Sequence, residues 1–427
     1  MRVLRLIPQL LLLLLPFASA GSVCETQPQQ VHISLAGNGY IRVSWVTTFK
    51  MATSVVEYGT TPGQYEEYTA GDSFGYHYYS YSSGKIHYAT IGPLESDTTY
   101  YYRCSGTGPE YSFKTPPAAF PAEFVVVGGL GQTEQTKATL SRIGHRCYDV
   151  LLSAGGLAYA HGQQPLWDSF GQLVEPYASQ RPWMVTAGYH EIEAVCTLTK
   201  GPQPYKAYNA RWLMPYHESG SVSNLYYSFD VAGAHIIMLG SYADYDASSA
   251  QFQWLKADLA SIDRVETPWV FVVVNTPWYT SNVAYKGEGE SMRKAMESLL
   301  YNARVDVVFQ SRVNAYERFA RVYDSNVDSC GPIYITLGDA GHKPTFDFEN
   351  AIPAISLHRD LSFGHGRLRI YDNKKAHWAW YRTTDDANDG PADEIWLTSL
   401  MSSEKCLELC ACTKVAKVSH QKAHDEL

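Results

Sequence analysis

The chain has 427 residues, 45% of them hydrophobic and 13% aromatic, a length and composition that favour two domains or one large one with sizeable cores. Its formal net charge of −9 and the lack of a basic stripe exclude nucleic acid or an anionic membrane surface as the main partner. The 32 tyrosines are assigned mainly to half-exposed strands.

The N-terminus has the order of a cleavable secretory signal. Arg2 and Arg5 precede an apolar stretch over residues 6–17, and Ala18-Ser19-Ala20 follows it. This stretch is too short for a membrane span, and no other run approaches that length. We therefore expect residues 1–20 to be a signal peptide and the mature chain to have no membrane span.

Residues 24–117 are predicted to form a small antiparallel domain. Turn residues separate short alternating segments at regular intervals, which is typical of a sandwich of the fibronectin or immunoglobulin type. The segments begin at Val31, Ile41, Ser54, Lys85 and Thr99. Pro116-Pro117 then marks the boundary to the next domain.

Residues 118–400 are predicted to form a second domain in which apolar strands alternate with helices such as 132–146 and 250–261. A ligand site in a sheet of this kind lies at the carboxyl ends of the strands. Five short apolar runs are each followed by a loop at that position. These runs are 124–127, 150–154, 183–187, 270–274 and 305–309.

The loops after the five runs resemble the metal-binding motifs of the plant purple acid phosphatases. They contain GGLGQT, GGLAYA, GYHE, NTPWY and QSRVNAYERF, where that family has GDLGQT, GDLSYAD, GNHE, HxPWY and GHVHAYERF. Similar segments extend from about residue 31 to residue 400. The resemblance implies a two-domain α+β/β fold, with an N-terminal fibronectin-III-like β-sandwich and a C-terminal αββα metallophosphoesterase-like sandwich.

The resemblance also implies that most of the metal ligands are lost. The family's two Asp ligands correspond to Gly129 and Gly156, its Asn to Tyr189, and its three His to Asn275, Arg312 and Asn314, so that only Tyr159 is retained. Two-metal catalysis needs several converging carboxylate, imidazole and amide donors. Glycine supplies no donor, and the permanent charge of an arginine repels a cation. We therefore expect no metal or other cofactor.

The replaced loops define a candidate pocket. We expect the two glycines to open space in it and its lining to be less acidic than the family's. The candidate catalytic residues are Tyr159, Tyr189, His190 and Arg312, and the candidate ligand-binding residues are Asn275, Asn314, His161 and Glu191.

Three functions follow from this pocket. The favoured one is a pseudoenzyme of the endoplasmic reticulum lumen that binds a small anionic or carbonyl-bearing ligand or a lumenal protein. The alternative is a metal-independent enzyme of plant specialised metabolism, of the lyase, cyclase, isomerase or condensation type. In it, His190 or a tyrosine would move a proton while Arg312 and the Asn amides hold an oxyanion. The third is residual acid phosphatase activity.

Four of the candidate residues also have a structural alternative. His190 is a buried structural histidine in this alternative, and Tyr159 is retained for packing. Glu191 holds the neighbouring loop, and Arg312 pairs with Glu317 or Asp339 instead of a ligand.

Residues 401–427 form a tail that contains Cys406, Cys410 and Cys412. Their spacing matches no standard zinc site, so we expect tail disulfides or free thiols, and spacing alone does not fix the pairing. The chain ends in His424-Asp425-Glu426-Leu427, which is a retention signal that a receptor of the endoplasmic reticulum recognises. No Asn-x-Ser/Thr sequon occurs, so we expect no N-glycan.

Overall fold

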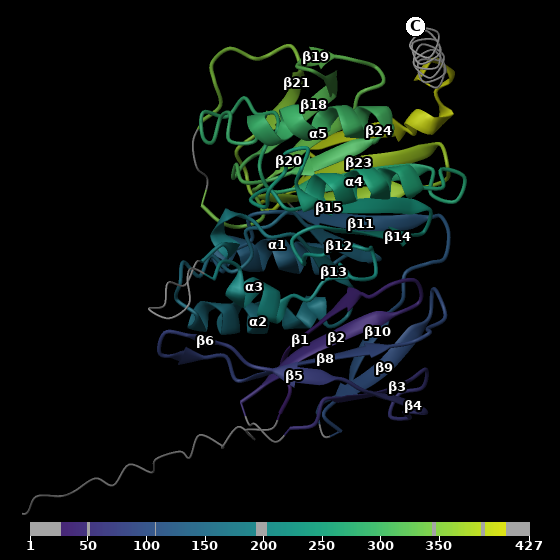
Figure 1. The fold of residues 1–427 in the computed structure, drawn as a ribbon, viewed down its shortest axis with the longest axis vertical. Helices are drawn as coiled ribbons and strands as arrows, with labels where there is room; N and C mark the ends of the chain where they lie inside the picture. The colour runs from purple at the N-terminus through teal and green to yellow at the C-terminus, as the bar shows by residue number, and fades with distance from the viewer. Residues whose placement is uncertain are drawn as a thin grey trace, which may run out of the picture.

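The computed structural model describes residues 27–48, 52–106, 108–193, 203–343, 347–385 and 389–406. The expected two-domain fold is confirmed, and the N-terminal domain (purple to blue) lies below the larger domain in Figure 1. The predicted signal peptide and retention signal lie outside the described residues. No helix in the described part of the chain is long and apolar enough to cross a membrane.

The N-terminal domain is a sandwich of two four-stranded sheets. One has the order β1 (Gln29–Leu35), β2 (Ile41–Thr47), β8 (Lys85–Ile91), β5 (Asp72–Phe74), and the other β10 (Tyr111–Lys114), β9 (Thr99–Cys104), β3 (Val55–Gly59), β4 (Glu67–Ala70). A small hairpin joins β6 (His77–Tyr78) to β7 (Tyr81–Ser82). Trp45 and Tyr102 are fully buried in the core. The sequence did not predict β4, because its side chains are mostly exposed and show no apolar alternation.

The larger domain contains two sheets. The first has the order β13 (Trp183–Val185), β12 (Val150–Ser153), β11 (Ala122–Val127), β22 (Gly364–Ile370), β23 (Lys375–Arg382), β24 (Asp393–Thr398). The second has the order β14 (Tyr227–Val231), β15 (Ala234–Leu239), β16 (Trp269–Val274), β17 (Val307–Gln310), β20 (Ile333–Leu337), β18 (Tyr316–Tyr323), β19 (Asn326–Val327), and β21 (Ser356–Asp360) pairs with β18.

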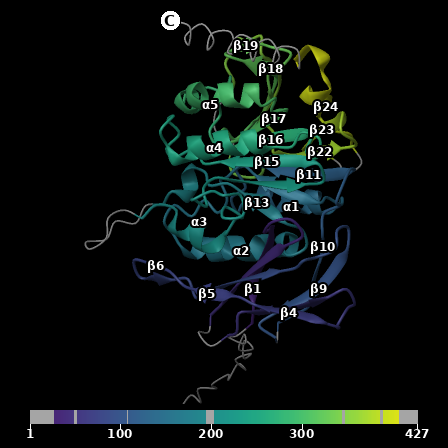
Figure 2. The same ribbon diagram turned by 45° about the vertical axis from the view of Figure 1, so that its right-hand side comes forward.

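Helices surround these sheets (Figures 1 and 2). They are α1 (Glu134–Gly144), α2 (Pro165–Ala178), α3 (Lys206–Arg211), α4 (Ala250–Ser261) and α5 (Glu290–Asn302). The predicted helix 250–261 coincides with α4, which Ser249 caps through its side chain. The helix predicted over 132–146 is shorter, since Thr133 forms the N-cap of α1.

The five apolar runs coincide with β11, β12, β13, β16 and β17. Every residue of β12 and β16 is buried, as expected for parallel strands covered on both faces. β11, β12 and β13 are parallel to one another, and so are β15, β16, β17 and β20. The loops that follow these strands therefore lie at the same ends of the sheets.

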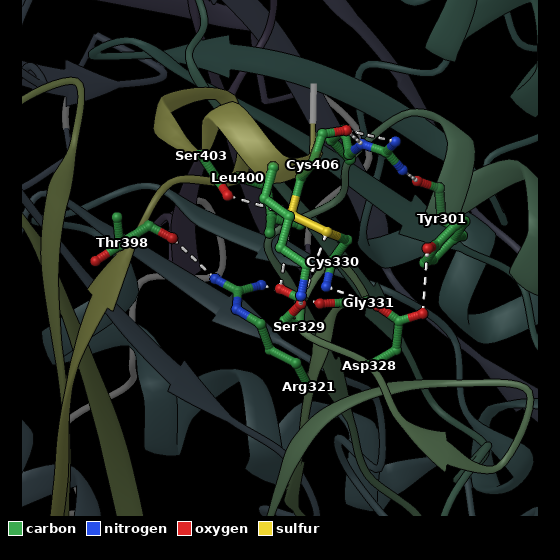
Figure 3. Close-up of a disulfide and its surroundings, with 12 residues drawn as sticks. Tyr301, Arg321, Asp328, Ser329, Cys330, Gly331, Thr398, Leu400, Ser403 and Cys406 are labelled. Atoms are coloured by element: carbon green, nitrogen blue, oxygen red, sulfur yellow. Dashed lines mark hydrogen bonds between the residues drawn. A yellow bond between two sulfur atoms is a disulfide. The ribbon is translucent and has the colours of Figure 1, made fainter. Parts of the chain in front are cut away.

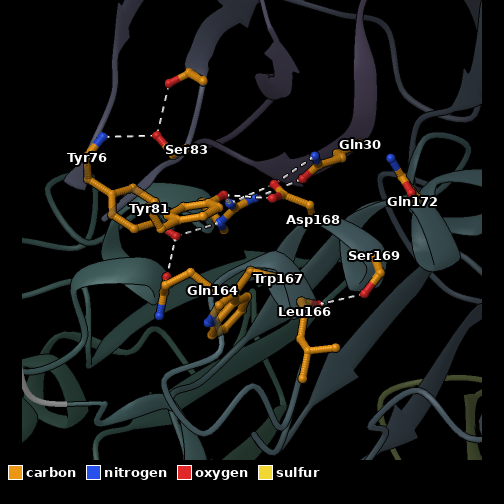
Figure 4. Close-up of polar contacts among 12 residues, drawn as sticks. Gln30, Tyr76, Tyr81, Ser83, Gln164, Leu166, Trp167, Asp168, Ser169 and Gln172 are labelled. Carbon is orange, nitrogen blue, oxygen red and sulfur yellow. Dashed lines mark hydrogen bonds and ion pairs between the residues drawn. The ribbon is translucent and has the colours of Figure 1, made fainter. Parts of the chain in front are cut away.

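A polar network joins the two domains (Figure 4). Arg211, at the end of α3, donates to Gln30 Oε1 at 2.8 Å, Tyr81 Oη at 2.6 Å and Asp168 Oδ1 at 2.9 Å. Its guanidinium is buried, and each of these partners accepts one of its hydrogens. The network fixes α2 and α3 against the β-sandwich, because a buried cation left unpaired is costly.

The tail cysteine Cys406 forms a disulfide, one of the two expected outcomes, and its partner lies in the larger domain. Cys406 is bonded to Cys330, 76 residues away in sequence, and Arg304 donates to the Cys406 carbonyl at 2.7 Å (Figure 3). Such a distant pairing leaves no signal in cysteine spacing. Cys410 and Cys412 lie outside the described residues.

Candidate functional site

Backbone hydrogen bonds join the replaced loops into one cluster. The amides of Gly129 and Leu130 donate to the carbonyls of Gly155 and Gly156 at 3.0 and 2.9 Å. From the second sheet, Asn275 Nδ2 donates to the Ala154 carbonyl at 2.6 Å. The loops that sequence placed at the strand ends therefore meet in space.

Gly129 and Gly156 have positive φ values of +64° and +70° and leave no free space beside them. A Cβ on Gly156 would lie 2.9 Å from the Tyr159 hydroxyl oxygen and 3.1 Å from the Gly129 Cα. A Cβ on Gly129 would overlap the Gly338 carbonyl oxygen. The expectation that the two glycines open space is wrong, because neighbouring backbone and the Tyr159 hydroxyl lie where the side chains would begin.

Aromatic rings pack side by side at this cluster. The Tyr159 ring stacks on His342 with centroids 3.7 Å apart and lies 4.1 Å from the His190 ring. The His161 ring meets His190 edge-on at 4.9 Å. Three of these residues, Tyr159, His161 and His190, are candidates from sequence, whereas His342 is not. The stacking of His342 on Tyr159 cannot be predicted from the spacing of the two residues in the sequence.

Burial keeps the rings of Tyr159, His190 and His342 neutral. Desolvation lowers the pKa of His190 to about 3, with a further contribution from the charge of Arg312. Desolvation likewise lowers the pKa of His342 to about 4 and raises that of Tyr159 above its usual value. At neutral pH, both imidazoles are therefore uncharged and the phenol is protonated.

Arg312 is held by groups that sequence did not predict. Its Nε lies 3.2 Å from Glu288 Oε2, and its guanidinium carbon lies 4.2 and 4.0 Å from the ring centroids of Tyr189 and Tyr285. Its Nη1 lies 3.3 Å from His190 Nε2. The Arg312 side chain is 9% exposed, whereas Tyr189 is 50% exposed and covers it from outside.

The carboxylates proposed from sequence as partners of Arg312 have other partners. Glu317 accepts hydrogen bonds from Ser281 and Ser356, and Asp339 accepts one from Trp380 Nε1 at 2.8 Å. Glu288 and Tyr285 belong to the segment between NTPWY and α5, and their roles depend on how that segment folds back.

The remaining predicted residues hold the loops. Glu191 is buried and accepts hydrogen bonds from the amides of Gly156, Leu157 and Gly188 at 2.8–2.9 Å. Asn314 Nδ2 donates to the Lys343 carbonyl at 2.6 Å. Asn275 Oδ1 lies 3.3 Å from both the Tyr189 amide and the Tyr242 hydroxyl. These contacts match the structural alternative for Glu191 and leave the two asparagines little capacity for a ligand.

The residues at the positions that correspond to the family's metal ligands do not fit a dinuclear metal site. Two of the positions carry no side chain, one carries a cation, and the retained Tyr159 has its proton held by a raised pKa. Within the described ranges, no three His, Cys, Asp or Glu side chains are grouped to hold a metal ion.

The cluster still offers some groups to a ligand. Arg312 Nη2 has no hydrogen-bond partner among the described residues, and His161 and Tyr189 are exposed. His190 Nδ1 is buried without a partner in the same part of the chain. The arrangement can therefore bind a small polar or anionic group at its rim.

Comparison with known families gives three matches along the chain. Residues 28–115 match the purple acid phosphatase N-terminal domain, residues 96–311 the calcineurin-like phosphoesterase domain, and residues 331–390 the iron/zinc purple acid phosphatase-like protein C domain. Purple acid phosphatase 22 of Arabidopsis thaliana is 58% identical over 384 residues, which cover 90% of this chain and 88% of that protein. Purple acid phosphatase 21 of the same plant is 54% identical, over 89% of this chain and 86% of that protein.

A solved structure has the same fold. A purple acid phosphatase from yellow lupin (Lupinus luteus) seeds superposes with a TM-score of 0.78 at 20% identity, over 89% of this chain and 76% of that one.

Proposed function

The chain belongs to the purple acid phosphatase family, and we propose that it is a member without the dinuclear metal site and without phosphatase activity. One observation carries this proposal: the retained Tyr159 hydroxyl lies against Gly156, where the Asp side chain implied by the family motif would begin. Arg312 adds a fixed positive charge to the same cluster. In the part of the chain that the structure describes, no three His, Cys, Asp or Glu side chains are grouped so that they could replace the lost ligands.

The role we propose is that of a pseudoenzyme that binds a small carboxylate or carbonyl-bearing ligand. The ligand would contact Arg312 Nη2 and the exposed ring of Tyr189. Glu288 already offsets part of the Arg312 charge, so a ligand with a single negative charge fits better than a phosphate dianion. The C-terminal His424-Asp425-Glu426-Leu427 supports a location in the lumen of the endoplasmic reticulum.

A metal-independent enzyme is the second candidate, and it is favoured by the buried His190 Nδ1, which has no hydrogen-bond partner among the described residues. A general base works best when its pKa lies near the working pH. The lowered pKa of His190, about 3, makes it a weak base at neutral pH, which places this candidate second.

The test of the proposed function combines two measurements on the mature chain, which lacks residues 1–20. Phosphomonoesterase activity should stay at background with and without added iron, zinc or manganese. Thermal shift against a panel of small carboxylates should identify a ligand. Metal-dependent turnover would contradict the proposed loss of phosphatase activity. A ligand whose binding is unaffected by Arg312→Ala would contradict the proposed ligand site at Arg312.

A further inference from the structure

An exposed pair of aromatic rings lies at the β24 end of the six-stranded sheet. Trp396 is on β24, the last strand of that sheet, at the right-hand side of Figure 2. Its side chain is 61% exposed, whereas the other nine tryptophans are buried or half-buried. The Tyr371 ring, 41% exposed, lies 5.4 Å from it at an angle of 35°. Large exposed apolar groups of this kind mark binding sites.

Both rings are supported from the protein side. The His377 ring lies 4.8 Å from Trp396, and His377 Nε2 is itself 3.0 Å from Glu394 Oε2. The Arg369 guanidinium lies 5.1 Å from the Tyr371 ring centroid. The rings are therefore held before any ligand arrives, which reduces the entropy cost of binding.

A cavity of about 550 Å³ that is widely open to solvent adjoins the rings, and its volume is within the usual range for small-molecule sites. Its polar lining comes from Asp372, Lys375 and Thr398. Asp372 Oδ1 accepts the amides of Lys374 and Lys375 at 2.7 and 2.8 Å, and the Asp372 carbonyl accepts from Trp269 Nε1 at 2.8 Å. These bonds fix the carboxylate beside the rings.

We propose that this cavity binds a saccharide. A pyranose ring has an apolar C–H face that packs on an aromatic ring and an edge of hydroxyl groups that need donors and acceptors. Trp396 and Tyr371 supply the apolar surface. Asp372 accepts from hydroxyls, while Lys375 and Thr398 donate to them. The Asp and Lys charges offset each other, which favours a neutral ligand over an anion or a quaternary ammonium.

The test uses the full mature chain with mannotriose and maltotriose as probes. Saturation-transfer NMR detects binding of each probe, and calorimetry measures its affinity. At least one probe should bind. Trp396→Ala should weaken binding tenfold or more, Trp396→Phe should retain most of it, and Asp372→Asn should weaken it at least threefold. Tyr68→Ala is the matched control, because Tyr68 is 74% exposed on the N-terminal domain and should leave the affinity unchanged.

Three results would overturn the proposal. One is that neither trisaccharide binds at millimolar concentration. Another is that Trp396→Ala binds as well as the unchanged chain. The third is a concentration-dependent dimer in sedimentation that Trp396→Ala abolishes, since the rings would then belong to a contact between copies of the chain.

Discussion

The guanidinium of Arg312 is bound by the carboxylate of Glu288, with Nε 3.3 and 3.2 Å from the two carboxylate oxygens. Tyr242 donates to the same carboxylate at 2.9 Å. The cation that replaces a metal ligand therefore has a protein anion beside it, and its remaining Nη2 is the group left for a ligand. This pairing is the basis of the first prediction.

Arg312→Ala should weaken binding of the ligand found by thermal shift about tenfold or more, a loss of about 1.4 kcal/mol. Arg312→Lys should give an intermediate loss, because an ammonium keeps the charge without the planar fork. Calorimetry on both variants checks this. Glu317→Gln is the control, because it removes a buried charge that is not part of the proposed ligand site. If Arg312→Ala and Glu317→Gln bind the ligand with equal affinity, the ligand binds elsewhere.

The contribution of His190 and His342 to the free energy of unfolding should fall as the pH is lowered from about 6.5 towards 4. The folded-state pKa values of His190 and His342, about 3 and about 4, lie below the ordinary value of 6.5. In this window the unfolded chain binds protons that the folded chain does not, so the stabilisation present above pH 6.5 is lost on acidification.

Denaturant unfolding at pH 7.5, 6 and 5 measures the slope of the free energy of unfolding against pH. His190→Gln and His342→Gln should each flatten it relative to the unchanged chain, and His77→Gln, an exposed histidine of β6, should not. Equal slopes in all four proteins would show that the two imidazoles are not buried as described.

Cys330→Ser should lower the free energy of unfolding by about 2–4 kcal/mol, because the disulfide to Cys406 closes a long loop in the unfolded chain. Cys147→Ser, which removes an exposed free thiol, is the control and should change little. Chemical denaturation under non-reducing conditions measures both. If the reductant-treated chain and the untreated chain unfold at the same midpoint, the disulfide does not stabilise the fold.

Deleting residues 424–427 should move the protein from the endoplasmic reticulum to the secretory medium or vacuole. A tag placed after residue 20 leaves the C-terminus free, and fluorescence microscopy compares the two forms. Deleting residues 420–423 instead shortens the tail equally but keeps the last four residues, so it should not change the location. Identical distributions for all three forms would contradict the retention signal.

Sequence predicted the strands whose residues are uniformly apolar, such as β16, because a short continuous apolar run is typical of a parallel strand that is buried on both faces. It did not predict β4, whose side chains are largely exposed. At the site, motif positions correctly indicated which loops meet. They could not indicate that Tyr159 abuts Gly156, which depends on the conformation of one loop, or that Glu288 reaches Arg312, which depends on how separate segments pack.

The metal content of the purified chain tests the central claim most directly. The chain would be produced with iron, zinc and manganese in the medium and analysed by elemental mass spectrometry, alongside an Arabidopsis purple acid phosphatase as the positive control. We predict far less than one metal ion per chain and no purple colour, because the donors at positions 129, 156 and 312 are absent. Two metal ions per chain, or one bound stoichiometrically through Tyr159, would contradict the account.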